Sequence, residues 1–169
     1  MSDLRVKLML REATLYMDDA EYLRGRLDSQ SNGAYLLDVF ALEILLKCSV
    51  VIETGKLERG HDYVQLFLKL DRGTREALIQ AAGSRMGPIA DYTDTYWLLA
   101  LALYGSNFSS MRYPYEAYGS MSEADYRRLG PEWIERGALV EEATFDFRPL
   151  ELHGLLHALS SYAAEKIAG

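Results

Sequence analysis

The most apolar part of the chain is the segment of residues 36–52, LLDVFALEILLKCSVVI. A helix formed by this segment would have almost no polar face. Its only charged residues are Asp38, Glu43 and Lys47. A helix that is apolar around nearly its whole circumference must be covered by other helices, so we expect this segment to be the central helix of the fold. Its charges and its length argue against a membrane span, which needs about 20 predominantly apolar residues.

Other segments repeat apolar residues at the spacing of a helix. Residues 3–27 carry one broad apolar stripe and are expected to pack along the central helix, and residues 150–167 form the clearest amphipathic pattern. The remaining helices are expected at 61–70, 76–82, 92–104 and 122–137. Together these segments predict an all-α helical bundle that forms a single domain over residues 1–169.

Polar residues, glycines and prolines predict where these helices begin and end. Thr54 and Gly55 should close the central helix, and the breaks are expected at residues 29–33, 71–74 and 83–91. Asp62, Thr74 and Ser122 are the expected helix caps.

Two stretches before the last helix lack a clear helical period. Residues 107–118 contain Pro114 and form either a kinked helix or a loop that lines a groove. Pro131 is expected to break the helix at 122–137, and residues 139–147 alternate weakly and are expected to be extended. An irregular insertion is therefore predicted before the last helix.

The cysteine content and the N-terminal segment bear on location. The single cysteine, Cys48, excludes an internal disulfide, and its place in the apolar helix predicts a buried thiol and a reducing compartment. Charges interrupt the N-terminal segment every few residues, so we expect neither a signal peptide nor an anchor. The prediction is a cytoplasmic protein with no membrane association.

Eighteen Lys and Arg against 25 Asp and Glu give a formal net charge of −7. This charge opposes nonspecific attraction to a polyanion, because phosphate contacts supply most of that affinity. A local basic site at Arg112 or at Arg127 and Arg128 remains compatible with the composition. The acidic balance suits a partner that is another protein, a nucleotide or one short strand.

Residues 107–116, NFSSMRYPYE, place Asn107, Arg112, Tyr113, Tyr115 and Glu116 close together in sequence. Arginine binds phosphate bidentately and tyrosines offer stacking faces for a base, so a nucleotide pocket is chemically reasonable. The alternative is an ion pair between Arg112 and Glu116 that staples a kink, with the tyrosines in the core or at an interface. Both interpretations stay open at this point.

The remaining polar groups have simpler interpretations. Glu43 and Lys47 stand four residues apart in the favourable order for an intrahelical ion pair, with a polar contact inside the bundle as the alternative. His153 and His157 have the spacing of two metal ligands but no third ligand nearby, so we expect half-exposed histidines flanking the core and no metal. No glycine-rich nucleotide motif or GxSxG motif is present, so we expect no dinucleotide or other cofactor and no hydrolase of that type.

Three segments in order, ALEILLKCSVVIETG, GHDYVQLF and NFSSMRYPYE, followed by an amphipathic last helix, resemble the HEPN family (higher eukaryotes and prokaryotes nucleotide-binding domain). The resemblance spans residues 35–118 and the last helix. It implies an up-and-down bundle, frequent homodimers, and roles in toxin–antitoxin, defence or RNA-processing systems. A nucleotidyltransferase-like protein is the partner that this resemblance implies.

Many active members of that family are metal-independent ribonucleases with an arginine followed, four to six residues later, by a histidine. Arg112 matches the arginine, but Ala117, Tyr118 and Gly119 stand where the histidine should be. We therefore expect no catalytic residue and a binding or regulatory module instead. The expected ligand-binding residues are His61, Asn107, Arg112, Tyr113, Tyr115 and Glu116.

Two alternatives to a binding module stay open. The first is a ribonuclease with a non-standard site in which Arg112 holds phosphate, His61 moves the proton and Glu116 assists. The second is an adaptor that docks a nucleotidyltransferase-like protein.

Aromatic residues predict a homodimer. The chain has 12 Tyr, 5 Phe and 2 Trp. Aromatic residues are enriched at interface cores, and a two-fold partner would cover a cluster of them. The expected cluster consists of Tyr92, Tyr96, Trp97, Tyr113 and Tyr115.

Overall fold

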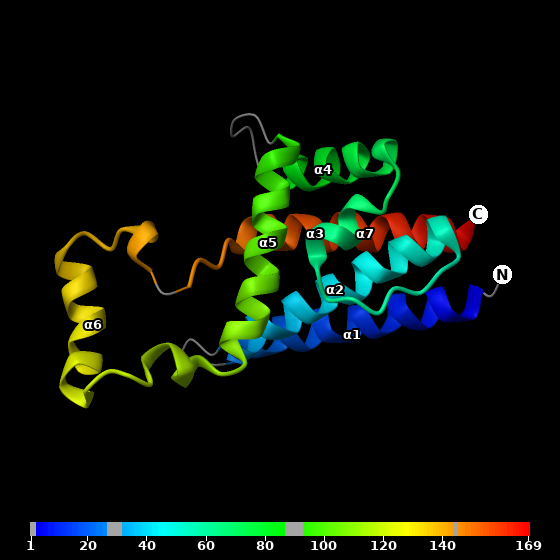
Figure 1. Cartoon of the computed structure of the whole chain (residues 1–169). Coiled ribbons are helices and arrows are strands. Elements are labelled where there is room, and N and C mark those ends of the chain that lie inside the picture. Colours follow the sequence, from blue (N-terminus) through cyan, green and yellow to red (C-terminus); the bar gives the residue numbers. More distant parts are fainter. Residues whose placement is uncertain (1–2, 27–31, 87–92, 144) are drawn as a thin grey trace.

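The computed structural model describes residues 3–26, 32–86, 93–143 and 145–169, and every regular element in those ranges is helical (Figure 1). The elements are α1 (Asp3–Arg26), α2 (Asn32–Thr54), α3 (Tyr63–Leu68), α4 (Arg72–Met86), α5 (Asp94–Met111), the 3-10 helix η1 (Pro114–Tyr118), α6 (Glu123–Glu135), the 3-10 helix η2 (Val140–Glu142) and α7 (Pro149–Ala168). The predicted all-α class is confirmed. Among the helices in those ranges, none is long and apolar enough to cross a lipid bilayer.

The apolar helix α2 forms the centre of the fold, as its sequence predicts. It packs against α1, α3, α5 and α7, and α7 in turn packs on α4. Figure 1 shows α1 along the lower edge of the molecule and α5 running across α7. The largest fully buried side chains include Trp97, Tyr63, Tyr104, Phe67, Leu42, Leu45, Leu46, Leu101, Leu152, Leu155, Leu156 and Leu159. One continuous core therefore lies between α2, α5 and α7.

The end of α2 and its cysteine follow the prediction. Gly55 adopts a left-handed φ of 69°, which glycine allows at no steric cost, and its N–H donates to the Val51 carbonyl at 2.8 Å. Cys48 is fully buried, and this burial raises the pKa of its thiol to about 11. The thiol is therefore a structural group rather than a nucleophile.

The start of α4 differs from the prediction. Thr74 is not the cap, because the Asp71 side chain accepts hydrogen bonds from the N–H groups of Gly73 and Thr74, each at 3.1 Å. The helix therefore begins about one turn earlier than expected and continues through Gly83 to its end at Met86. The rest of the expected loop, including Tyr92, lies outside the described residues.

The region before the last helix is more helical than predicted. Ser122 caps α6 as expected, accepting from the Asp125 N–H at 3.1 Å. Pro131 does not break α6, because the helix has no buried residue and the carbonyl that loses its partner can be solvated. The expected extended segment at 139–147 instead contains η2, closed by the Glu142 N–H donating to the Leu139 carbonyl at 3.1 Å. Residue 144 of that expected segment is not among the described residues.

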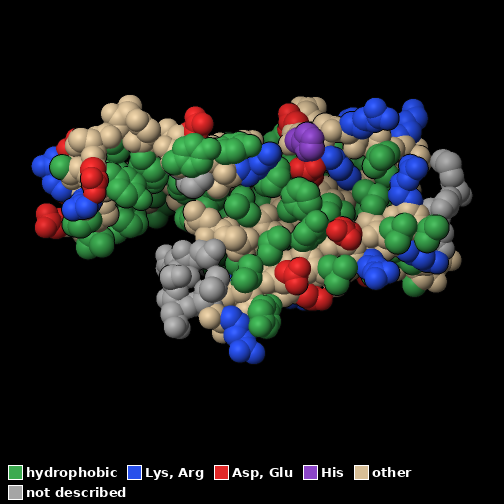
Figure 2. All heavy atoms as spheres, turned by 90° about the horizontal axis from the view of Figure 1, so that it is seen from below, with side chains coloured by type: hydrophobic (Ala, Val, Ile, Leu, Met, Phe, Trp, Pro, Cys, Tyr) green, Lys and Arg blue, Asp and Glu red, His purple; other side chains and the backbone are tan. Residues whose placement is uncertain are grey.

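Residues 112–143, which we call the excursion, lie outside the body of the fold. Figure 1 shows α6 standing apart from the other long helices, and Figure 2 shows the same part as a lobe at the left. Two hydrogen bonds tie the outgoing chain to the returning chain. The Tyr104 hydroxyl donates to the Arg148 carbonyl at 3.0 Å, and the Asn107 amide donates to the Asp146 carbonyl at 2.7 Å. The excursion is thus closed at its base by α5.

Candidate functional site

A buried carboxylate organises the first candidate site. Glu43 is only 6% exposed, and its Oε1 lies 2.8 Å from Lys47 Nζ and 2.9 Å from His61 Nδ1. The Tyr63 hydroxyl donates to Oε2 at 3.3 Å. The predicted intrahelical pair is therefore confirmed, and the same carboxylate also makes a contact inside the bundle. We call these four residues the Glu43 cluster.

The start of α3 sets the geometry of this cluster. Asp62 caps the helix as predicted, accepting from the Gln65 N–H at 3.0 Å. This cap places Tyr63 in the core, where burial and then the charge of Glu43 raise the pKa of the phenol, so it remains a donor. His61 lies on the outside, with 71% of its side chain exposed.

The Glu43–His61 contact has a chemical consequence. Because Nδ1 of His61 faces the carboxylate, Nε2 is the ring nitrogen left for a ligand, and it makes no hydrogen bond within the described part of the chain. An imidazole held by a carboxylate in this way is suited to proton transfer or to hydrogen bonding with an anion. Sequence reasoning named His61 but not Glu43 as its partner.

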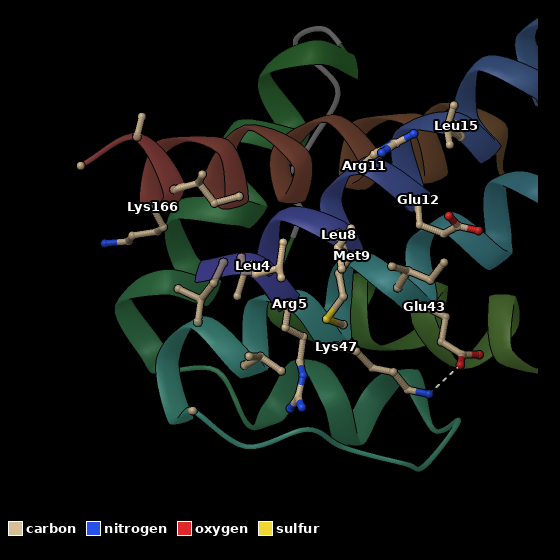
Figure 3. Close-up of a pocket in the computed structure, with 18 residues that line it drawn as sticks. Leu4, Arg5, Leu8, Met9, Arg11, Glu12, Leu15, Glu43, Lys47 and Lys166 are labelled. Carbon is tan, nitrogen blue, oxygen red and sulfur yellow. Dashed lines mark hydrogen bonds and ion pairs between the residues drawn. The ribbon is translucent and has the colours of Figure 1, made fainter. Parts of the chain in front are cut away.

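A groove of about 1620 Å³ begins beside the Glu43 cluster. It is lined by α1, α2 and the end of α7, and Glu43 and Lys47 lie at its edge. In Figure 3, Lys47 reaches Glu43 while Leu8 and Met9 of α1 lie along the groove. Its lining is therefore mixed, with apolar side chains between charged ones.

The second candidate site lies where α5 ends. The Arg112 guanidinium carbon is 5.4 Å from the ring centre of Phe108 and 5.6 Å from that of Tyr113. The rings of Tyr113 and Tyr115 meet edge to face, with their centres 6.2 Å apart. Tyr113 is 48% and Tyr115 66% exposed, so both rings can contact a ligand. We call these four residues the Arg112 platform.

The Arg112–Glu116 ion pair, the alternative to a nucleotide pocket in the sequence analysis, is not formed. Within the described ranges, no ion pair joins these two residues, and the turn is closed by backbone hydrogen bonds instead. The Glu116 N–H donates to the Tyr113 carbonyl at 2.9 Å. Because Tyr113 and Tyr115 are exposed, they are not core residues either. The guanidinium of Arg112 thus has no carboxylate partner among the residues described.

Asn107 has a structural role, because its side chain is buried and hydrogen-bonded inside the protein. It is 4% exposed, and its amide nitrogen donates to the Tyr35 hydroxyl at 2.8 Å as well as to the Asp146 carbonyl. Burial raises the pKa of Tyr35 to about 12, so that hydroxyl stays protonated. The amide that sequence reasoning gave to a ligand is already used inside the protein.

The Glu43 cluster and the Arg112 platform are separate groups of contacts. No hydrogen bond, ion pair or ring contact between described residues joins His61 to Arg112 or Glu116. A single site that contains all three residues stays a prediction.

A second buried carboxylate was not identified from the sequence as a site. Asp38 is 2% exposed and binds Arg24 Nη1 at 2.5 Å and His153 Nε2 at 3.1 Å. His153 therefore ties α7 to α2 rather than merely flanking the core. The charge of Asp38 inside an apolar helix was the signal that it needed buried partners. Within the described ranges, no group of three or more potential ligands could hold a metal.

The aromatic residues do not form the single cluster from which a dimer was predicted. Trp97 is fully buried, Tyr92 lies outside the described residues, and Tyr96 is near the start of α5. Tyr113 and Tyr115 follow the other end of that helix, about 25 Å away at a rise of about 1.5 Å per residue. A homodimer stays a prediction, but this argument for it fails.

Comparison of the chain with protein-family models, with curated proteins and with solved structures found no match. The function must therefore be inferred from the chemistry of the Glu43 cluster and the Arg112 platform.

Proposed function

We propose that the chain is a HEPN-like binding module of a toxin–antitoxin or defence system that holds a nucleotide or a short single-stranded RNA on the Arg112 platform. The observation that carries this proposal is an exposed guanidinium, stacked on two rings, that pairs with no carboxylate in the described part of the chain. Arginine recognises phosphate bidentately, and exposed tyrosine rings stack on bases of any sequence. The resemblance to the HEPN family supports the same class of ligand.

The size of the platform limits the ligand and the affinity. Stacking contributes about 1–3 kcal/mol per base, and two exposed tyrosines offer two such contacts. With one phosphate contact from Arg112, the total corresponds to a dissociation constant on the order of 0.1–1 mM. The net charge of −7 opposes a longer polyanion. We therefore expect weak binding of one or two nucleotides per chain.

Fluorescence anisotropy with a labelled hexauridylate tests this proposal. Arg112→Ala and Tyr115→Ala should each weaken binding by about fivefold or more, because a stacked base or a phosphate contact is lost. Arg26→Ala is the matched control, because Arg26 also stacks on an exposed tyrosine, with its guanidinium carbon 5.3 Å from the Tyr22 ring centre. Equal binding by wild type and Arg112→Ala contradicts the proposal, and so does an absence of binding by wild type at millimolar protein.

The Glu43-held imidazole favours one alternative, a metal-independent ribonuclease in which His61 moves the proton and Arg112 binds phosphate. Without such a proton carrier, acid–base assistance of about 100- to 10,000-fold is lost. We expect no cleavage, because Ala117, Tyr118 and Gly119 occupy the positions of the family histidine. The comparison is wild type against His61→Ala and Arg112→Ala on a mixed-sequence RNA with chelator. If wild type cleaves the RNA and neither variant does, the ribonuclease is the correct function and the binding-module proposal is wrong.

The excursion favours the adaptor alternative. Its exposed hydrophobic residues include Met121, Tyr126, Ile134, Leu139 and Val140. A protein that copurifies with wild type, but not with a chain whose excursion is replaced by a short linker, supports the adaptor. Nucleotide in the purified wild type supports the binding module.

A further inference from the structure

Two histidines of α7 lie on one face of that helix, beside α4. His153 and His157 are four residues apart, a spacing that places side chains next to each other on a helix surface. Gly154 stands between them in sequence and faces α4, since a Cβ built on it would lie only 3.0 Å from the Ala82 carbonyl oxygen. The backbones of α4 and α7 therefore meet beside the two imidazoles (Figure 1).

This close approach brings a guanidinium to the imidazoles. Arg85 comes three residues after Ala82, on the same face of α4 and in its last turn. Burial, and then the charges of Arg85 and His153, lower the pKa of His157, so the three groups lie close enough for their charges to act on one another. A cation suits the end of α4, but this does not account for two basic side chains on the neighbouring helix. We call these three residues the Arg85 cluster.

The Arg85 cluster has unused hydrogen-bond donors. Within the described residues, Arg85 and His157 form no hydrogen bond or ion pair. His153 uses Nε2 for Asp38 of α2, at 3.1 Å, and keeps Nδ1, while Asp38 is also bound by Arg24 of α1. Arg85 and His157 are exposed, and so is 40% of the His153 side chain. A ligand can therefore reach all three basic groups.

We propose that Arg85, His153 and His157 bind a phosphate group, either free phosphate or that of a phosphorylated small molecule. A guanidinium binds two phosphate oxygens at once, and each imidazolium can donate an N–H to a further oxygen. A dianion also offsets the mutual repulsion of three cations, which a neutral ligand would not do. The site shares no residue with the Glu43 cluster or the Arg112 platform, so the inference does not depend on the proposed nucleotide site.

Binding should be linked to protonation of the two histidines, because only the imidazolium carries a charge. Besides the histidines, the charged groups at this site are Arg85 of α4, Asp38 of α2 and Arg24 of α1. Linkage is reciprocal, so a bound anion raises the pKa of His153 and His157 by as much free energy as their protons add to its binding. The anion should therefore bind more tightly as the pH falls.

Proton NMR of the imidazole C–H signals tests the site in the full chain. The chain has three histidines, so the third, His61, serves as an internal reference, and substitution of each histidine by glutamine assigns the signals. Inorganic phosphate, added with a chelator present at about pH 6, should shift the signals of His153 and His157 saturably and raise both pKa values. The signal of His61 should not change.

Substitutions separate a built site from general attraction of anions. Arg85→Ala should raise the dissociation constant for phosphate by about tenfold or more, because a bidentate charged contact is lost. Arg5→Ala is the matched control, since Arg5 is exposed and has no ion pair within the described ranges but lies on α1. Sulfate keeps both charges while histidine titrates, so its affinity should rise by about fivefold or more between about pH 8 and about pH 5.5. His157→Gln should reduce this pH dependence.

Ribose 5-phosphate distinguishes the two sources of the phosphate group. Binding tighter than that of inorganic phosphate by about tenfold identifies a phosphorylated small molecule, and equal or weaker binding identifies free phosphate. Both results support the site. The proposal is overturned by equal shifts of all three histidines, by the absence of a saturable shift at His153 and His157, or by an unchanged dissociation constant for Arg85→Ala.

Discussion

Replacing Glu43 by glutamine should destabilise the protein far more than an ordinary ion-pair substitution. The side chains of Glu43 and Lys47 are only 8% and 14% exposed, so the substitution leaves a nearly buried ammonium without its counter-ion. Breaking a buried pair by removing one partner costs about 3–5 kcal/mol. Some water reaches Lys47, so we expect a loss of about 2–4 kcal/mol in the free energy of unfolding.

The other contacts of Glu43 contribute less to this loss. The Tyr63 hydroxyl also lies 3.4 Å from the Val39 carbonyl, so it keeps an acceptor. His61 is largely exposed, and water can replace the carboxylate at its ring nitrogen. The unpaired charge of Lys47 should therefore dominate the effect.

Urea unfolding followed by circular dichroism measures these free energies. A cycle of Glu43→Met, Lys47→Met and the double variant isolates the pair, and the double variant should be within about 1 kcal/mol of wild type because no charge remains buried. Glu123→Gln is the matched control, since Glu123 and Arg127 form a pair at the same spacing but are 77% and 75% exposed. That control should change stability by less than about 0.5 kcal/mol.

Two results refute this reasoning. The first is a Glu43→Gln variant no less stable than Glu123→Gln, which means that burial does not govern the cost. The second is additivity of the two methionine substitutions, which means that Glu43 and Lys47 do not depend on each other.

Three further predictions concern packing, pH and thiol reactivity. Gly154→Ala should destabilise the protein by about 1–3 kcal/mol in the same urea assay, because the added Cβ would lie 3.0 Å from a backbone oxygen of α4. Gly130→Ala is the control and should not destabilise the protein, because its added Cβ would meet nothing within 4 Å. Burial and the charge of Arg85 lower the pKa of His157, so the folded state favours the neutral imidazole. The stability that this neutral form contributes is fully present above a pH of about 6.5 and should fall as the pH drops. His157→Gln should make the free energy of unfolding less dependent on pH in this range. Cys48 should resist a thiol reagent at about pH 8 in the folded protein and react in urea, since its thiol is buried.

The long helices were predictable from local sequence, because residues 36–52 are apolar around nearly the whole helix and residues 150–167 repeat apolar residues at helical spacing. α2 extends a few residues beyond the predicted 36–52, and α7 matches 150–167 to within a residue at each end. The start of α4 was not predictable from Thr74, because the Asp71 side chain accepts hydrogen bonds from the N–H groups of Gly73 and Thr74 and so caps the helix earlier in the chain. Pro131 misled for a related reason, since a helix with no buried side tolerates an unpaired carbonyl.

The candidate sites were predictable only in their residue types. Arg112, Tyr113 and Tyr115 contact one another, as their closeness in sequence suggests, but whether they face solvent depends on how α5 ends. Asn107 was assigned to a ligand, because nothing local reveals that Tyr35 and Asp146, distant in sequence, take its amide protons. The contact between His61 and Glu43 was not predictable for the same reason, since these residues are also distant in sequence. A buried carboxylate in an apolar helix was the one available sign of both polar clusters.

The hydrogen bonds at the base of the excursion make it a separable module. α5 already holds the returning chain through Tyr104 and Asn107, and the described residues of 112–143 contribute no buried side chain to the core. Changing the length of a closed loop costs only about 0.6 kcal/mol for each doubling. Insertions, deletions or a grafted epitope in this segment should therefore be compatible with the same folded body. Evolution and protein engineering can alter that part of the chain while leaving α2 and its neighbours intact.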